Sequence, residues 1–196
     1  MLRAALAILA LCALVACGGE GQQRGIATPE EVAKARYQGS GPPSLTLYTM
    51  LNNRTGAGGH TALLVNASQR VIFDPAGSFH YPTTPRRGDV LFGMSPKMSA
   101  AYESMHARET HHVVAQTILV PADVAEKALQ LVLANGAVPQ TQCASSTSAI
   151  LGQLPGIEGL GQTLYPDNLM RRFAKVRGVT ERKLYEDFDP TKAVAE

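Results

Sequence analysis

Apolar and polar residues alternate in short runs through the first part of the chain and recur at helical spacing later on. Runs typical of β-strands occupy residues 44–51, 60–65, 70–73, 89–94 and 111–120. Helical spacing and capping signals predict helices over residues 29–37, 96–109, 122–134, 143–154 and 166–176. Strands come first and helices later, without regular alternation. This order favours an α+β fold with an antiparallel sheet packed against helices.

A hairpin joins the second and third predicted strands, because "NASQ" between them is a turn signal. If residues 66–68 form the loop, Val65 pairs with Gln69 and His60 lies opposite Asp74 on the same face of the sheet. A loop one residue longer or shorter would break that pairing. Asp74 also opens an Asp-Pro-Ala-Gly turn, in which its side chain would bond its own backbone instead.

The N-terminus has the pattern of a secretory signal. A short positive start precedes "AALAILALCALVA", which is too short for a permanent transmembrane helix of about 20 residues. It ends in "LVAC" (14–17), which resembles the bacterial lipobox. This resemblance implies that residues 1–16 are a lipoprotein signal peptide and that Cys17 is lipidated after cleavage. An ordinary secretory signal that ends near a cysteine is the alternative.

The remaining chain suits one domain. Residues 17–43 are rich in Gly, Gln, Pro and charge, and we expect the lipidated cysteine and a flexible tether there. Residues 44–196 would form a single domain with a full core. Gly18 follows the lipidated cysteine, and similarity to enterobacterial sorting favours the outer membrane, facing the periplasm. The partner expected through Cys17 is therefore membrane lipid.

Charge and cysteine content narrow the function. The chain has 18 Lys and Arg against 16 Asp and Glu, so no strong field for nucleic acid is expected. Of the three cysteines, Cys12 leaves with the signal and Cys17 is consumed by lipid. Cys143 is then the one free thiol in a compartment that favours disulfides, and an intramolecular disulfide is excluded.

Cys143 has the sequence context of an activated thiol. It follows a Pro-containing loop, with Thr141 as the expected N-cap and Cys143 about two residues into a helix. Unpaired N–H groups and the helix dipole favour a thiolate there, and the same groups can form an oxyanion hole. The alternative is a small buried hydrophobic residue, since free cysteines are often buried.

His60 and Asp74 supply the other parts of a thiol site. His60 opens a strand directly after flexible glycines, where its ring can reach into a cleft. In the predicted hairpin, Asp74 holds one ring nitrogen while the other faces Cys143, which is a nucleophile, base and orienter arrangement. A solvated histidine at a strand end is the alternative for His60.

Other polar groups give weaker signals, and no metal or cofactor is expected. The cluster of His106, Glu109, His111 and His112 resembles a ligand set, but adjacent residues of a strand point to opposite faces. "GAGGH" precedes a strand and lacks the lysine of a phosphate loop. Two basic pairs, Arg86-Arg87 and Arg171-Arg172, are typical of solvated surface and could also face anionic headgroups.

An early histidine at the start of a strand, a polar residue at the end of the next strand and a late cysteine opening a helix resemble the circularly permuted NlpC-like branch of the papain fold. That branch includes lecithin:retinol acyltransferase-like enzymes, YiiX-like proteins and lipoprotein N-acyltransferases of the Lnb type. The resemblance covers residues 44–175. It implies a permuted papain-like fold with Cys143 as nucleophile, His60 as base and Asp74 as the third polar residue.

Two functions follow from these patterns. The first is a membrane-tethered periplasmic thiol hydrolase or acyltransferase acting on an amide or ester, with an acyl lipid slightly favoured over a peptidoglycan peptide as substrate. The second is a noncatalytic envelope lipoprotein that uses the fold for binding or assembly. Two departures motivate it, because many relatives have Asn where this chain has Gln142 and often have His where it has Asp74.

Overall fold

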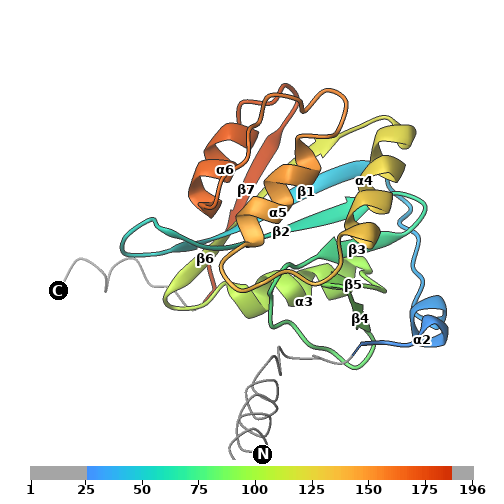
Figure 1. Cartoon of the computed structure of the whole chain (residues 1–196). Helices are drawn as coiled ribbons and strands as arrows, with labels where there is room; N and C mark the ends of the chain where they lie inside the picture. Colours follow the sequence, from blue (N-terminus) through green and yellow to red (C-terminus); the bar gives the residue numbers. More distant parts are fainter. Residues whose placement is uncertain (1–25, 187–196) are drawn as a thin grey trace, which may run out of the picture.

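The computed structural model describes residues 26–186, and these form one antiparallel sheet of seven strands with helices on both faces (Figure 1). The spatial order is β4-β5-β3-β2-β1-β6-β7. The strands are β1 (Ser44–Asn52), β2 (Gly58–Asn66), β3 (Arg70–Phe73), β4 (Arg86–Arg87), β5 (Val90–Leu91), β6 (His111–Leu119) and β7 (Thr180–Leu184). The helices are α2 (Pro29–Lys34), α3 (Pro96–His106), α4 (Ala122–Asn135), α5 (Cys143–Leu151) and α6 (Pro166–Phe173). The predicted α+β class is confirmed.

The two faces of the sheet are covered by different helices. Side chains of a strand alternate between faces, so odd-numbered residues such as Leu47 and Leu63 pack in one core cluster with residues of α4, α5 and α6. Even-numbered residues such as Tyr48 and Ala62 pack in a second cluster with Tyr102 of α3. In Figure 1, α4 and α5 lie across one face and α3 lies across the other.

Local signals account for most element boundaries. Ser95 caps α3 by accepting a hydrogen bond from the Met98 N–H, and Gly136 ends α4 with a φ of 75°. The predicted strands at 44–51 and 111–120 correspond to β1 and β6. Two elements were not predicted. β4 is only two residues long, and β7 is a charged, exposed edge strand without the apolar alternation that identifies a strand.

The predicted register of the hairpin is wrong by two residues. Val65 pairs with Val71 rather than with Gln69, and Asn66 pairs with Arg70, so the loop is 67–69. Asn66 remains in the strand, where its side-chain amide donates to the carbonyl of Pro42 at 2.9 Å. Because side chains in a strand repeat every two residues, a shift of two keeps each side chain on its predicted face.

The segment expected to be a flexible tether is packed on the domain from residue 26 onward, which corrects that expectation. Ala27 is 7% exposed, and its N–H donates to the Arg86 carbonyl. Val32 and Ala35 of the α2 region pack against the core. The expected signal peptide (1–16) and Cys17 lie outside the described residues. Within 26–186, no helix has the length and apolarity needed to cross a bilayer.

Candidate active site

The candidate site lies where β3 stops and β2 continues. β3 ends at Phe73, while β2 extends back to Gly58, so the start of β2 has no partner from β3. The N-terminus of α5 packs against β2 at this place, and the backbone N–H of Thr61 hydrogen-bonds the thiol of Cys143. The termination of one strand therefore brings Cys143 next to β2.

Helix α5 begins at Cys143 itself, which corrects two expectations. Thr141 does not cap the helix, because its φ of 70° places it in the left-handed region; Gln142 is the N-cap instead. Cys143 is the first helical residue rather than lying about two residues inside. The described residues provide no side-chain cap for α5, and the Ala144 N–H donates to the Cys143 sulfur.

The Cys143 thiol is buried, with 7% of the residue exposed, and its pKa is lowered. Burial by itself would raise the pKa of the thiol. The hydrogen bond and positive charge of His60 outweigh that effect, with further help from the two backbone N–H groups of Thr61 and Ala144. The surroundings of Cys143 therefore favour a thiolate. A cysteine that served only as a small buried hydrophobic residue would not need these polar contacts.

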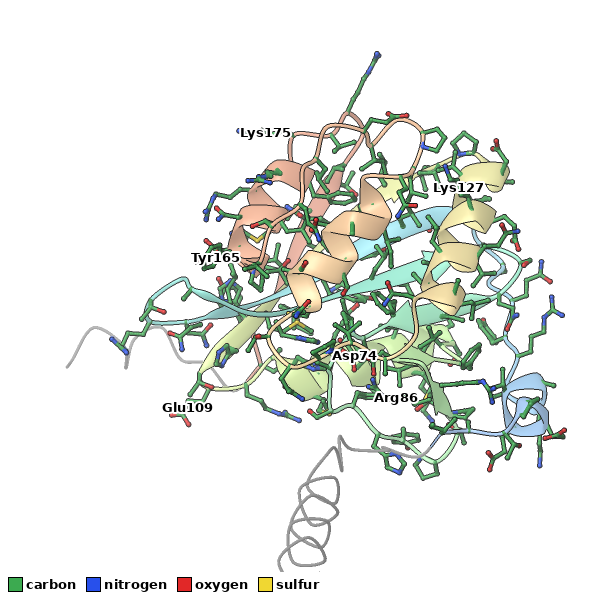
Figure 2. All side chains as sticks on the ribbon, in the orientation of Figure 1. Asp74, Arg86, Glu109, Lys127, Tyr165 and Lys175 are labelled. Atoms are coloured by element: carbon green, nitrogen blue, oxygen red, sulfur yellow. The ribbon has the colours of Figure 1, made fainter. Side chains whose placement is uncertain are left out.

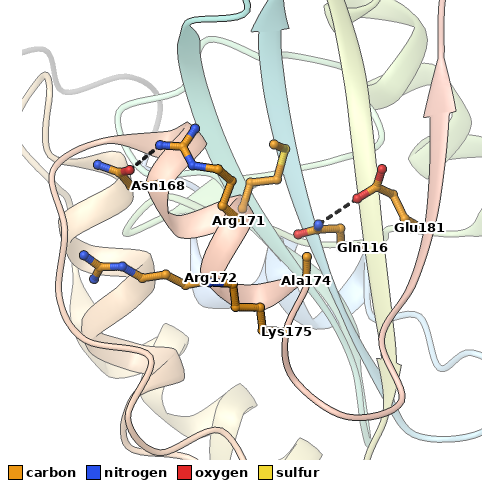
Figure 3. Close-up of a pocket in the computed structure, with 8 residues that line it drawn as sticks. Gln116, Asn168, Arg171, Arg172, Ala174, Lys175 and Glu181 are labelled. Carbon is orange, nitrogen blue, oxygen red and sulfur yellow. Dashed lines mark hydrogen bonds between the residues drawn. The ribbon is translucent and has the colours of Figure 1, made fainter.

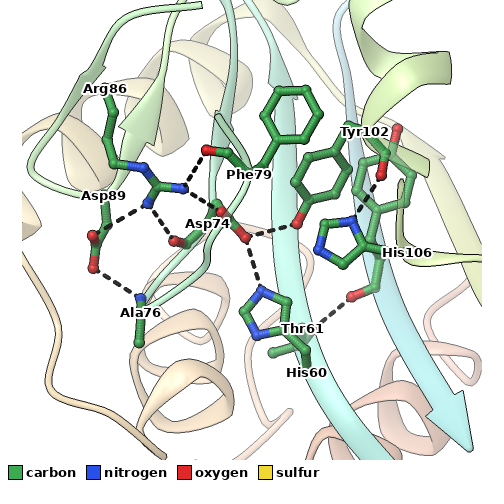
Figure 4. A network of polar contacts seen from close by, with 10 residues as sticks. His60, Thr61, Asp74, Ala76, Phe79, Arg86, Asp89, Tyr102 and His106 are labelled. Carbon is green, nitrogen blue, oxygen red and sulfur yellow. Dashed lines mark hydrogen bonds and ion pairs between the residues drawn. The ribbon is translucent and has the colours of Figure 1, made fainter. Parts of the chain in front are cut away.

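His60 contacts both Asp74 and the thiol of Cys143, and Figure 4 shows the contact with Asp74. Its Nε2 is 2.8 Å from Oδ1 of Asp74, so Nε2 donates to the carboxylate and Nδ1 is left for Cys143. Burial alone would lower the pKa of His60. Hydrogen bonds to Asp74 and Cys143, together with the negative charges of both, raise it to about 9. A protonated imidazole beside a thiolate is the state that these contacts favour.

Asp74 is fully buried, and three side chains donate to its carboxylate (Figure 4). The hydroxyl of Tyr102 donates to Oδ1 at 2.7 Å, the guanidinium of Arg86 donates to Oδ2, and His60 donates to Oδ1. Burial would raise the pKa of this carboxyl group, but the contacts to His60, Arg86 and Tyr102 hold it well below its usual range.

The turn expected at residues 74–77 also forms, and it leaves the Asp74 side chain available. The Gly77 N–H donates to the backbone carbonyl of Asp74 at 3.0 Å, while the carboxylate accepts from His60, Arg86 and Tyr102. His60 and Asp74 meet diagonally across the hairpin rather than directly opposite each other, because of the shifted register. The structure thus brings all three predicted side chains, Cys143, His60 and Asp74, together.

Two residues of this network were not anticipated. Arg86 belongs to a basic pair expected to be solvated, but its side chain is only 10% exposed and it also bonds Asp89. A Pro-rich loop followed by a basic pair gives no signal of this contact. Tyr102 was one residue of a predicted helix, and its hydroxyl meets Asp74 only because α3 packs beneath β2 and β3.

His106 lies beside the site and is bonded to the backbone of α3. Its Nδ1 donates to the carbonyl of Tyr102 at 2.7 Å, and its ring is 6.0 Å from that of His60, centroid to centroid. Burial lowers its pKa, so the ring stays neutral near the His60 imidazolium. Throughout residues 26–186, no three His, Cys, Asp or Glu side chains converge to hold a metal ion.

Comparison of the chain with protein-family models, with curated proteins and with solved structures gave no match. The interpretation of the site therefore rests on its geometry.

Proposed function

We propose that this protein is a membrane-tethered thiol enzyme of the cell envelope, a hydrolase or acyltransferase in which Cys143 is the nucleophile. The observation that carries the proposal is the contact chain from the Cys143 thiol to His60 and on to the buried carboxylate of Asp74. Nucleophile, base and orienter stand in hydrogen-bonding sequence, which is the arrangement that activates a weak nucleophile.

The reaction proceeds in two stages. The thiolate attacks the carbonyl carbon of an amide or ester, and the oxyanion that forms is stabilised by N–H groups next to the sulfur, such as that of Ala144. The C–N or C–O bond then breaks, and the leaving amine or alcohol takes a proton from His60. Water or an amine, deprotonated by His60, attacks the thioester and releases Cys143 as thiolate.

The order of elements supports the proposal that the fold is a permuted papain-like, NlpC-like one. The base lies on β2, its orienter directly after β3, and the nucleophile opens a later helix that packs on β2. The lipobox-like sequence at Cys17 and the acyltransferase-like order favour an acyl lipid over a peptidoglycan peptide as substrate.

The alternative is a noncatalytic envelope lipoprotein. The observations that favour it are the 7% exposure of Cys143 and the presence of Gln142 before the cysteine. A structural cysteine with this burial would have a raised pKa and low reactivity, so the two functions predict opposite behaviour of the thiol.

The test is the pH dependence of alkylation of Cys143 in the chain that begins at residue 18. We expect rapid alkylation well below the ordinary thiol pKa of about 8.5. His60→Ala should slow the reaction at pH 6.5 by at least about tenfold, because burial then raises the pKa of the thiol without compensation. Asp74→Asn should give an intermediate rate.

The matched control is His80→Ala, which removes an exposed histidine outside the network. It should react like the wild-type protein. Equal and slow alkylation in all four proteins would contradict the proposed activation and favour the noncatalytic function.

A further inference from the structure

The C-terminal half of α6 and the strand β7 enclose a second polar region, away from the thiol. A hollow of about 540 Å³ lies between them, and Arg171, Arg172 and Lys175 line it (Figure 3). We call it the basic hollow. A neighbouring hollow of about 500 Å³ shares Arg172 and Lys175 and adds Arg177. Positive side chains are therefore concentrated at this end of the molecule.

Internal contacts hold two of these cations in place. Arg171 bonds Oδ2 of Asp167 at 2.7 Å and also bonds the side chain of Asn168. Arg172 uses only Nη1, which donates to backbone carbonyls of the preceding loop, the nearest at 3.2 Å. Its Nη2 and Nε have no partner among residues 26–186 and can donate to a ligand as a fork.

The acidic groups at the hollow are already engaged. Glu181 accepts a hydrogen bond from Nε2 of Gln116 at 2.9 Å and lies 3.8 Å from Nζ of Lys183. Asp167 is paired with Arg171. Lys175 is exposed and forms no ion pair within the described part of the chain. The hollow thus has unneutralised positive charge and suits an anionic ligand.

Exposed apolar side chains lie at the other end of the same helix. Leu164 and Tyr165, directly before α6, are 57% and 64% exposed. Figure 2 shows Tyr165 and Lys175 on the same side of the molecule, the side formed by α6. A tyrosine and a leucine next to a group of cations are typical of a surface that meets the boundary between lipid headgroups and acyl chains.

We propose that the basic hollow binds the phosphate of an anionic phospholipid headgroup and that α6 seats the domain on the bilayer. The guanidinium of Arg172 and the ammonium of Lys175 meet the phosphate oxygens, while Leu164 and Tyr165 enter the interface. A lipobox-like sequence gives the chain its anchor, whereas this surface would fix the orientation of the domain.

The start of α6, next to Leu164 and Tyr165, lies close to the candidate active site. The segment before α6 is bonded to the helix that Cys143 opens, since Nε2 of Gln162 donates to Oγ of Ser145 at 2.9 Å. At the start of α6, Pro166 packs tightly against Gly58, two residues before His60. This step rests on the proposed function. A bilayer that contacts α6 would then bring acyl lipids to the side of the molecule on which Cys143 begins α5.

The test is co-sedimentation of the chain that begins at residue 18, which contains every described element, with two kinds of vesicle. One kind is phosphatidylcholine alone and the other contains added phosphatidylglycerol. The variant Arg172→Glu/Lys175→Glu reverses the two cations that would meet the phosphate. Lys34→Glu/Arg36→Glu makes the same change of net charge at exposed residues near α2, far from α6 (Figure 1).

We expect the wild-type protein to bind phosphatidylglycerol vesicles at least about tenfold more tightly than phosphatidylcholine vesicles, with binding that weakens as salt is added. Arg172→Glu/Lys175→Glu should remove this preference, and Lys34→Glu/Arg36→Glu should retain it. Equal loss in both variants would assign the effect to overall charge and overturn the proposal, as would equal binding of wild type to the two kinds of vesicle.

Two further arms separate this proposal from others. In the first arm, binding of glycerol 3-phosphate to the wild-type protein is measured. If it binds and saturates while the protein shows no preference between the two kinds of vesicle, the ligand is a soluble phosphate ester, and the proposed bilayer contact is overturned. Cys143→Ala should bind vesicles like the wild-type protein. Vesicle binding therefore tests the proposed lipid surface, and alkylation of Cys143 tests the proposed thiol chemistry, so failure of one can be distinguished from failure of the other.

Discussion

Gly77 shows how closely the residues around Asp74 are packed. A Cβ atom built on Gly77 would overlap the carboxylate of Asp74. Because Gly77 has no side chain, the turn after β3 can pass close to the Asp74 carboxylate while the carboxylate binds His60 and Arg86.

The first prediction is that Gly77→Ala disturbs the site without changing any polar group in it. The new methyl group should displace the Asp74 carboxylate, lower the free energy of unfolding by about 1–3 kcal/mol and slow the alkylation of Cys143 at pH 6.5. Denaturant unfolding and thiol alkylation measure the two effects. Gly41→Ala, where a Cβ meets nothing within 4 Å, is the matched control. Identical behaviour of the two variants would contradict this account of Gly77.

At the scale of elements, the site joins groups from the two faces of the sheet. His60 and Asp74 belong with α3 on one side, and Cys143 comes from α5 on the other. They meet past the end of β3, where no strand separates the two layers. Helix α3 contributes the Tyr102 hydroxyl, whose pKa is raised well above its usual value by burial and then by the charge of Asp74, so it remains a donor.

The second prediction concerns this contribution of α3. Tyr102→Phe removes one donor from a buried carboxylate and should lower the free energy of unfolding by about 1.5–3 kcal/mol, the range for hydrogen bonds to charged groups. Arg86 and His60 still bind Asp74 in this variant. Denaturant unfolding checks the change against Tyr165→Phe, which removes an exposed hydroxyl. If both variants are equally stable, the Tyr102 contact contributes nothing.

At the scale of the whole molecule, Asp74 links parts of the chain that are distant in sequence. Its side chain contacts His60 of β2, Arg86 of β4 and Tyr102 of α3. The ordinary pKa of 3.8 is lowered in the folded protein. A carboxyl group of this kind stabilises the fold above its ordinary pKa, and the stabilisation is lost as the pH falls through the lower, folded value.

The third prediction follows from this direction of the pH dependence of stability. The free energy of unfolding of the wild-type protein should decrease as the pH falls below about 4. Asp74→Asn should be less stable at pH 7 by about 3–5 kcal/mol, because Arg86 and His60 lose their buried partner. It should also lose much of the dependence on acidic pH. Denaturant unfolding at pH 3 to 7 measures both. Parallel curves for the two proteins would show that Asp74 does not couple protons to folding.

The sequence by itself determined most of the elements and the faces of the strands of the hairpin. The alternation in 44–51 and 60–65 and the caps at Ser95 and Gly136 are local properties, which neighbouring residues dictate through sterics and hydrogen bonding. The face shared by His60 and Asp74 was also predictable, because a two-residue error in register leaves the faces unchanged.

Only the tertiary structure decided the partners across the sheet. The meeting of the end of β3 with the start of α5 depends on how the layers pack, and so do the burial of Arg86 and the contact of the Tyr102 hydroxyl with Asp74. Residues far apart in the chain carry no local signal of such contacts. The same holds for β7, a charged strand that forms because β6 offers an open edge. Local chemistry fixed which side chains could react, and long-range packing fixed which of them meet.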